Sequence, residues 1–171
     1  MRKIIPVLGL LALLSVAAFF WLKPNPHPKN QKIDKLVVLK SERKLLAYAN
    51  GKLLKTYPIA LGRNPVGHKR FEGDCKTPEG KYTINDKNPN SGYHKNLGIS
   101  YPNAQDLAKA QLLGKPAGGA IKIHGMRNGH SYLGLFHTFS DWTYGCIAVT
   151  NAEMDELYAQ TPIGTPIEIK P

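Results

Sequence analysis

The chain has 171 residues, a length typical of a single domain that can bury a hydrophobic core of its own. It carries 23 lysine and arginine residues against 12 aspartate and glutamate residues, so its formal net charge of +11 favours polyanionic partners. The basic residues are scattered and match no nucleic-acid-binding motif, so we expect a cationic solvated surface and no nucleic-acid function.

The first 23 residues have the pattern of a membrane-targeting segment. Arg2 and Lys3 precede the uncharged run Ile4–Leu22, which is long enough to cross a hydrocarbon core of about 30 Å. The basic pair places the N-terminus in the cytoplasm and the rest of the chain outside. The small residues before Ala18 leave a cleaved signal peptide open, but residues 19–21 continue the apolar run, which favours an uncleaved signal anchor.

Residues 24–32 predict an extended spacer, because three prolines alternate there with polar residues. We therefore expect the folded domain to span residues 33–171. Short apolar runs separated by turn residues predict strands in this domain, and Asn50-Gly51 is a strong hairpin signal. The expected strands lie at residues 36–39, 44–48, 52–60, 80–84, 98–101, 120–124, 146–149 and 166–169.

Two helices are expected among these strands. The first covers residues 103–113, where an asparagine cap precedes good helix formers and Gly114 ends the run. The second begins at Thr150, because Thr150 and Glu153 have the spacing of a capping box. Many short strands with few helices predict a mostly β domain, a sandwich or barrel with small helical additions.

Cys146 is the candidate nucleophile. It lies in the stretch DWTYGCIAVTN, at the start of an expected strand, while His124 ends another expected strand and Gly125 follows it. A thiol becomes nucleophilic beside a base, and it needs donors for the oxyanion that forms on attack. Gly145 permits a close backbone approach, so the amides of Gly145 and Cys146 are expected to face a substrate carbonyl.

Other interpretations of these residues stay open. Cys146 has the features of a buried structural thiol, and a disulfide with Cys75 would suit an oxidising compartment. His130 and His137 are rival bases. A zinc site formed by His124, His137 and Cys146 matches no known ligand spacing, so we expect no metal.

The segments around the histidine and the cysteine resemble the active-site signature of the L,D-transpeptidase (YkuD-type) catalytic domain family. That signature is a histidine-glycine pair at a strand end, a loop, and then Ser/Thr-x-Gly-Cys; here these are His124-Gly125 and residues 143–146. Residues 77–82 (TPEGKY) are similar to a second element of the family, and residues 97–103 and 164–169 resemble segments of its Gram-negative branch.

The resemblance covers residues 33–171. It implies an L,D-transpeptidase-like β-sandwich with small helices, here preceded by the N-terminal membrane-anchor helix.

The resemblance also implies a two-step acyl transfer without metal or organic cofactor. Cys146 would attack the carbonyl of the third residue of a peptidoglycan stem peptide, and His124 would move the proton. The carbonyl of Gly125 would orient His124, and amides around Tyr144 and Gly145 would form the oxyanion hole. The terminal D-amino acid would leave, and an amine or water would take the acyl group. Acylation of Cys146 by a carbapenem is a further expectation.

Three further residues are expected to contact substrate: Arg127, Thr143 and Trp142. Many family members have an arginine two residues after the cysteine, where this chain has Ala148. Arg127 is therefore our first candidate for a substrate carboxylate, followed by Arg63 and Arg70.

The chain departs from the family pattern at Tyr144, where many members have histidine, at Ala148, and in its interval of 22 residues between His124 and Cys146. These departures leave the reaction open between cross-linking and hydrolysis by an L,D-carboxypeptidase or an amidase that releases wall-bound protein. A non-catalytic wall-binding domain with a structural disulfide is a third possibility. The expected protein is a periplasmic monomer held at the inner membrane by residues 4–22.

Overall fold

The structure is a computed structural model that describes residues 31–171. The expected signal anchor and nearly all of the spacer lie outside the described residues. Among residues 31–171, no helix combines the length and the apolar character needed to span a membrane.

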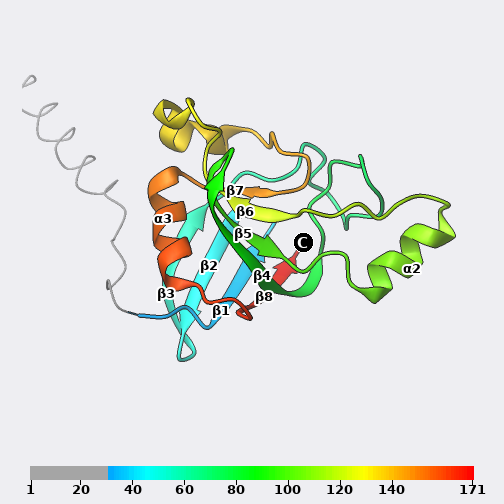
Figure 1. Cartoon of the computed structure of the whole chain (residues 1–171), viewed down its shortest axis with the longest axis horizontal. Coiled ribbons are helices and arrows are strands. Elements are labelled where there is room, and N and C mark those ends of the chain that lie inside the picture. The colour runs from blue at the N-terminus through cyan, green and yellow to red at the C-terminus, as the bar shows by residue number, and fades with distance from the viewer. Residues whose placement is uncertain (1–30) are drawn as a thin grey trace, which may run out of the picture.

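Eight strands form one sheet in the order β3-β2-β1-β8-β4-β5-β6-β7 (Figure 1). Their bounds are β1 Lys35–Leu39, β2 Lys44–Ala49, β3 Lys52–Pro58, β4 Gly80–Ser91, β5 His94–Ile99, β6 Lys122–His124, β7 Ile147–Ala148 and β8 Pro166–Lys170. Two α-helices, α2 (Ala104–Leu112) and α3 (Asn151–Gln160), and the 3-10 segment η1 (Ser131–Phe139) complete the described part.

The sheet curls until its two ends meet. The first part of β4 (residues 80–83) pairs with β8, whereas the rest of β4 pairs with β5, so β4 belongs to both halves of the sheet. At the other side, Ala60 bridges Ala148 of the last strand. The mostly β fold with few helices predicted from the sequence is confirmed. The sandwich expected there differs from the structure, in which one curled sheet forms both layers and β4 belongs to each of them.

The largest difference from the predicted elements is the β4–β5 hairpin. The sequence predicts strands at 80–84 and 98–101, but β4 continues to Ser91 and β5 begins at His94. Residues 85–97 contain four asparagines, one proline and one glycine, which favour turns in isolation. Pairing between the two strands, with register shifts after Ile84 and Asn88, overrides this local preference.

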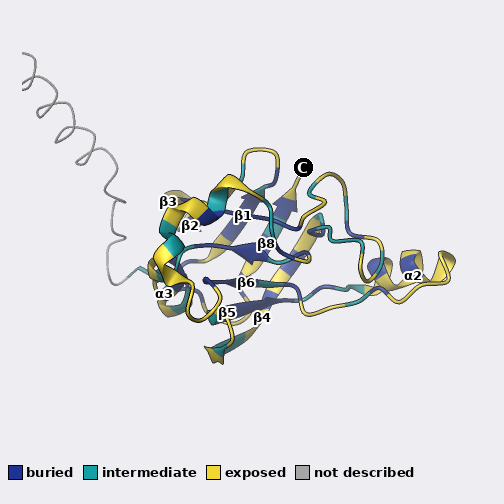
Figure 2. Ribbon diagram, turned by 90° about the horizontal axis from the view of Figure 1, so that it is seen from above, coloured by how far each residue is buried: buried dark blue, intermediate teal, exposed yellow. Residues whose placement is uncertain are grey.

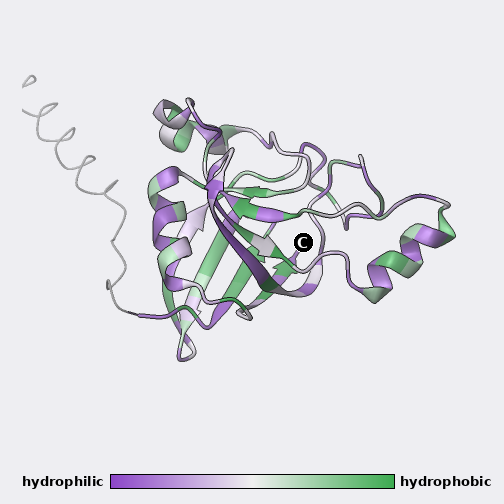
Figure 3. Ribbon diagram, in the orientation of Figure 1, coloured by the Kyte–Doolittle hydropathy of each residue, from purple (hydrophilic) through white to green (hydrophobic). Residues whose placement is uncertain are grey.

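The core lies inside the curl. In β2, alternate residues Leu45, Ala47 and Ala49 are buried, as the two-residue period of a half-exposed strand requires. Buried and hydrophobic stretches accordingly lie along strands such as β1 and β2 in Figures 2 and 3, whereas the long strand β4 is largely hydrophilic. Each fully buried leucine or isoleucine stabilises the fold by roughly 1.5–3 kcal/mol.

Both predicted helices are confirmed at their capped ends. The side chain of Asn103 accepts hydrogen bonds from the first turn of α2, which stands away from the sheet and is largely exposed (Figure 2). Thr150 and Glu153 form the predicted capping box of α3, which packs against β5 and β6. At the start of α3, Asn151 accepts a hydrogen bond from the backbone N–H of Met126, 2.8 Å away. Helix α3 therefore holds the segment that follows β6.

Replacing Thr150 with alanine is expected to lower the free energy of unfolding by about 1 kcal/mol, because the N–H of Glu153 loses its acceptor. Urea denaturation measures this loss. The matched control is Thr150→Ser, which keeps the hydroxyl and should remain close to the parent. Equal losses in both variants would contradict a capping role.

Candidate active site

Two neighbouring strands bring His124 and Cys146 onto the same face of the sheet. Strands β6 and β7 run parallel, and Ile123 pairs with Ile147. Both isoleucines belong to the core. Because successive side chains of a strand alternate between faces, the residues next to them in sequence, His124 and Cys146, face away from the core. There both line a common cavity.

This cavity has a volume of about 770 Å³ and lies between the end of the sheet and the segment that carries η1. Its volume is in the range of small-molecule and peptide sites. The lining side chains that matter below are Arg63, Tyr93, Lys122, His124, Arg127, His130, His137, Trp142, Thr143, Tyr144 and Cys146.

The ring of His124 is buried and held on several sides. Its Nδ1 lies 2.7 Å from the carbonyl oxygen of Gly125, which is the contact predicted from the sequence. The rings of Tyr93 and Trp142 flank it at centroid distances of 4.7 and 5.7 Å. Since a carbonyl only accepts, Nδ1 carries the proton. The other nitrogen of a neutral ring is then an unprotonated base.

Gly125 leaves room for this arrangement. A Cβ atom at this position would lie 2.7 Å from Oδ1 of Asn151, the atom that accepts from the N–H of Met126. Any larger residue would displace Asn151 or the backbone that bonds the histidine ring. The His-Gly pair of the sequence therefore has a packing reason as well as a chemical one.

Burial shifts the pKa values of both candidate reacting groups toward their uncharged forms. Burial raises the pKa of the Cys146 thiol, although the backbone N–H of Lys122 and the positive charges of Lys122 and Lys69 partly oppose it. Burial also lowers the pKa of His124, against the opposing effect of its hydrogen bond to Gly125. These directions favour a neutral thiol and a neutral imidazole in the same cavity, a combination that suits general-base activation and not a preformed ion pair.

Alkylation by iodoacetamide tests this conclusion. In a Cys75→Ser variant, Cys146 is the single cysteine of the chain. Because the thiolate is the nucleophile, its alkylation rate should rise with pH and reach half-maximum above the range of an ordinary thiol. Glutathione, titrated in parallel, is the reference. A rate that is already level below neutral pH would mean a preformed ion pair.

The turn before Cys146 is fastened by Thr143. Its buried hydroxyl donates to the carbonyl of Cys146 (2.8 Å) and accepts from the N–H of Gly145 (3.1 Å). Gly145 has a φ of +129°, and a Cβ there would lie 2.6 Å from the carbonyl oxygen of Lys76. Only glycine fits this conformation and this space.

These bonds bear on two predictions from the sequence. The amide of Gly145, expected in the oxyanion hole, already donates to Thr143. Thr143, expected to contact substrate, uses its hydroxyl within the turn, although it also lines the cavity. The polar groups of a tight turn satisfy one another first, which motif spacing does not reveal.

Two of the three arginine candidates border the cavity. Arg127 and Arg63 both line it, and Arg63 bonds the carbonyl of Trp142 (3.2 Å) while its guanidinium lies 4.6 Å from the ring centre of Tyr144. Arg70 is exposed and is not among the lining residues.

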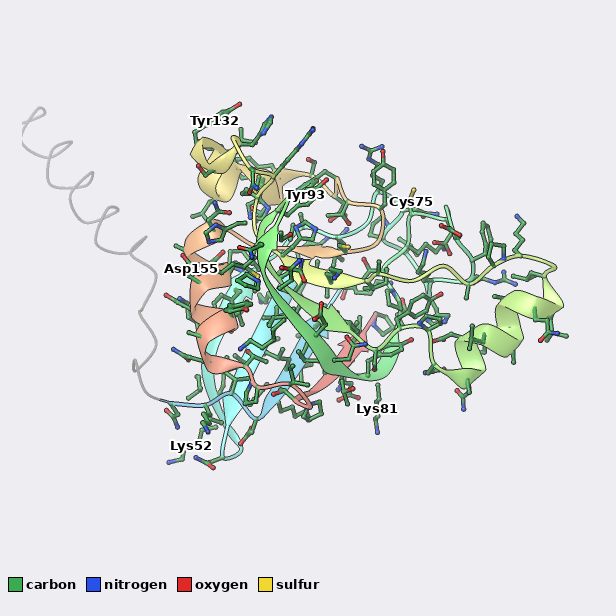
Figure 4. All side chains as sticks on the ribbon, in the orientation of Figure 1. Lys52, Cys75, Lys81, Tyr93, Tyr132 and Asp155 are labelled. Atoms are coloured by element: carbon green, nitrogen blue, oxygen red, sulfur yellow. The ribbon has the colours of Figure 1, made fainter. Side chains whose placement is uncertain are left out.

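The disulfide considered from the sequence is absent, because Cys75 and Cys146 are both free thiols. Cys75 does not line the cavity. It lies on the loops above the sheet (Figure 4). Among residues 31–171, no group of three or more histidine, cysteine, aspartate or glutamate side chains is arranged to hold a metal ion.

The sequence pattern did not identify Tyr93 as a site residue, and it indicated His137 only as an alternative base to His124 and as a possible zinc ligand. Tyr93 lies at the tip of the β4–β5 hairpin, beside η1 (Figure 4), and stacks on Trp142 at 6.2 Å. The signal that could have found it is an aromatic residue directly after Gly92 in an asparagine-rich segment.

Comparison with known proteins places the chain. Residues 34–169 match the family model described as the L,D-transpeptidase catalytic domain. YafK of Escherichia coli (strain K12) is 28% identical over 174 residues, an alignment that covers 92% of this chain and 63% of YafK.

Solved structures agree in fold. The helical cell shape determining protein Pgp2 of Campylobacter jejuni has a TM-score of 0.59 at 28% identity, over 82% of this chain and 48% of Pgp2. An L,D-transpeptidase of Xylanimonas cellulosilytica has a TM-score of 0.51 at 16% identity, over 91% of this chain and 69% of that chain, a likeness of fold alone. The chain spans about half the length of Pgp2 and less than two thirds of YafK. The match over residues 34–169 shows that this chain belongs to the L,D-transpeptidase catalytic domain family.

Proposed function

We propose that residues 33–171 catalyse acyl transfer on peptidoglycan stem peptides, with Cys146 as the nucleophile. The proposal rests on the position of the two groups in one cavity. His124 ends β6, Cys146 directly precedes the neighbouring strand β7, and the carbonyl of Gly125 orients the imidazole ring. Membership in a family whose catalytic domain acts on peptidoglycan peptides supports the choice of substrate.

In the first step, neutral His124 accepts the thiol proton as sulfur attacks the carbonyl carbon of the third residue, a diamino acid. The imidazolium then gives this proton to the leaving nitrogen, the terminal D-amino acid departs, and a thioester remains on Cys146. Since the amide of Gly145 is engaged, the amides of Tyr144 and Cys146 are the proposed donors to the oxyanion. In the second step, His124 takes a proton from the attacking amine or water, and the thiol is released.

The acceptor decides the biological outcome. An amine of a second stem gives a cross-link, whereas water gives trimming, as in the hydrolases considered from the sequence. Pgp2 is named for determining helical cell shape, which supports a role in remodelling the wall. We place the protein in the periplasm as a monomer, held at the inner membrane by residues 4–22.

Product analysis tests the proposal. The full chain is incubated with purified disaccharide tetrapeptides and the products are separated by mass spectrometry. Cross-linked dimers with release of the D-amino acid are expected for transfer to an amine, and tripeptide monomers for hydrolysis. The control is Cys75→Ser, which removes the thiol outside the cavity and should give the same products. An unchanged mixture from the wild-type chain would refute an acyl-transfer enzyme.

A further inference from the structure

The segment η1 exposes apolar side chains and buries a polar one. Tyr132, Phe136 and Phe139 are 76%, 71% and 80% exposed. Tyr132 lies at the outer surface of the molecule (Figure 4). Of the nine residues of η1, all of which the structure describes, His137 is the only buried one, at 5% exposure. The hydrophobic effect alone would bury the apolar side chains of η1 and expose the histidine. The inward position of His137 therefore points to a role for its ring in the cavity.

His137 has no hydrogen-bond partner there. Neither of its ring nitrogens bonds to any group of residues 31–171, and the buried indole N–H of Trp142 is also without a partner in this range. Both side chains line the cavity that holds Cys146. Buried polar groups without partners destabilise a fold, and native proteins retain few of them. Three nitrogen atoms without hydrogen-bond partners in one cavity indicate that a bound molecule supplies the missing partners.

We propose that His137 and Trp142 form a subsite that binds a backbone amide of the stem peptide, a specificity determinant that rests on the proposed function. Burial lowers the pKa of His137 to about 4, helped by the nearby titratable ring of His124, so the ring of His137 is neutral at neutral pH. A neutral imidazole offers one donor and one acceptor, and an indole offers one donor. This set matches an amide, which has both an N–H and a carbonyl.

A carboxylate fits this subsite less well, because it offers acceptors only. It would also leave the acceptor nitrogen of His137 unpaired, or require the ring to become charged in a buried place. The exposed guanidinium groups of Arg127 and Arg63, which also line the cavity, suit a carboxylate better. The other titratable groups that line the cavity are Tyr93, Lys122, His124, His130, Tyr144 and Cys146.

Two substitutions separate hydrogen bonding from shape. His137→Phe keeps a planar ring without polar atoms, and His137→Gln keeps one donor and one acceptor. Binding is measured by calorimetry in a Cys146→Ala background, where no turnover occurs, with a synthetic stem tetrapeptide ending in D-alanine. We expect His137→Phe to weaken binding at least about tenfold and His137→Gln to stay within about threefold. Removing the unsatisfied nitrogens should also give free His137→Phe an unfolding temperature at least as high as that of the parent.

The stability of free His137→Phe distinguishes a binding role from a structural one, because a structural histidine would destabilise the protein when replaced. The imidazole NMR signals of His137 identify the bound group. With the tetrapeptide bound, its pKa should stay below the ordinary value of 6.5. A pKa above that value would mean a bound carboxylate and overturn the amide subsite. Equal affinity of His137→Phe and the parent, or no tetrapeptide binding by the parent, would overturn it as well.

Turnover separates this inference from the proposed function. In the otherwise wild-type chain, His137→Phe should raise KM for the tetrapeptide with kcat little changed, as expected when uniform binding is lost. Unchanged KM and kcat would overturn the subsite and leave the enzyme proposal standing. If the wild-type chain bound the tetrapeptide through His137 but formed no product, the subsite would stand and the proposed acyl transfer would be refuted.

Discussion

Cys146→Ala is expected to abolish acyl transfer, with a loss of roughly 10⁴-fold or more in kcat, because no other group in the proposed mechanism can form the thioester. The intact-protein mass gives a direct measurement. Wild-type protein treated with a carbapenem should gain the mass of one inhibitor, and Cys146→Ala should gain none. The fold should be little affected, since the thiol makes only weak hydrogen bonds, with the carbonyl of Ala120 at 3.6 Å and with the backbone N–H of Lys122.

Cys75→Ser is the matched control for this experiment. It removes the second and last cysteine of the chain, which is free and lies outside the cavity. It should keep full activity and the full mass gain. If Cys146→Ala were still acylated and Cys75→Ser were not, the nucleophile would be Cys75 and the proposed mechanism would be wrong.

His124→Gln is expected to lower kcat/KM by roughly 10²–10⁴-fold, the usual contribution of general acid–base catalysis. Glutamine keeps a polar side chain of similar length but has no basic nitrogen, so the thiol of Cys146 must lose its proton to water. Since burial already raises the pKa of this thiol, little thiolate forms without the base. Steady-state kinetics with the tetrapeptide measure the loss.

The pH profile adds a second measure of the same residue. His124 acts while neutral, so wild-type kcat/KM should fall as the pH drops through the pKa of His124. Burial places that pKa below 6.5, and the acid limb should therefore begin below the ordinary histidine range. The residual activity of His124→Gln should lack this limb.

His94→Gln is the control, because His94 pairs with Asp155 at the surface, 2.7 Å away, and is not part of the cavity lining. It should leave both rate and pH profile within about twofold of the parent. An acid limb that persists in His124→Gln would assign the titration to another group.

The elements that depend on neighbours in the chain could be predicted from the sequence. Alternating apolar residues place the short strands, Asn50-Gly51 marks the β2–β3 hairpin, and Thr150 with Glu153 marks the start of α3. The same holds in part for the chemistry of the candidate site. The residue pattern alone left Cys146 open between a buried thiol, a disulfide partner and a nucleophile, and the resemblance to the family signature favoured a nucleophile with His124 as its base.

The features that depend on distant pairing could not be predicted in this way. The sheet closes through a bridge between Ala60 and Ala148, which are far apart in the sequence. The length of the β4–β5 hairpin depends on pairing between the two strands, which the local sequence does not specify. The hydrogen bond between Gly145 and Thr143 is shorter in range, but it depends on a turn conformation that the motif does not specify.

The sequence by itself determined most of the strands, the capped helices and the candidate residues for acyl transfer, because each is specified by local pattern, side-chain chemistry or a family signature. Only the tertiary structure decided that burial favours the uncharged forms of Cys146 and His124, that Cys75 stays unpaired, and that His137 turns inward from an apolar segment. Burial and the supply of hydrogen-bond partners decide these properties, and both are set by the packing of the whole domain.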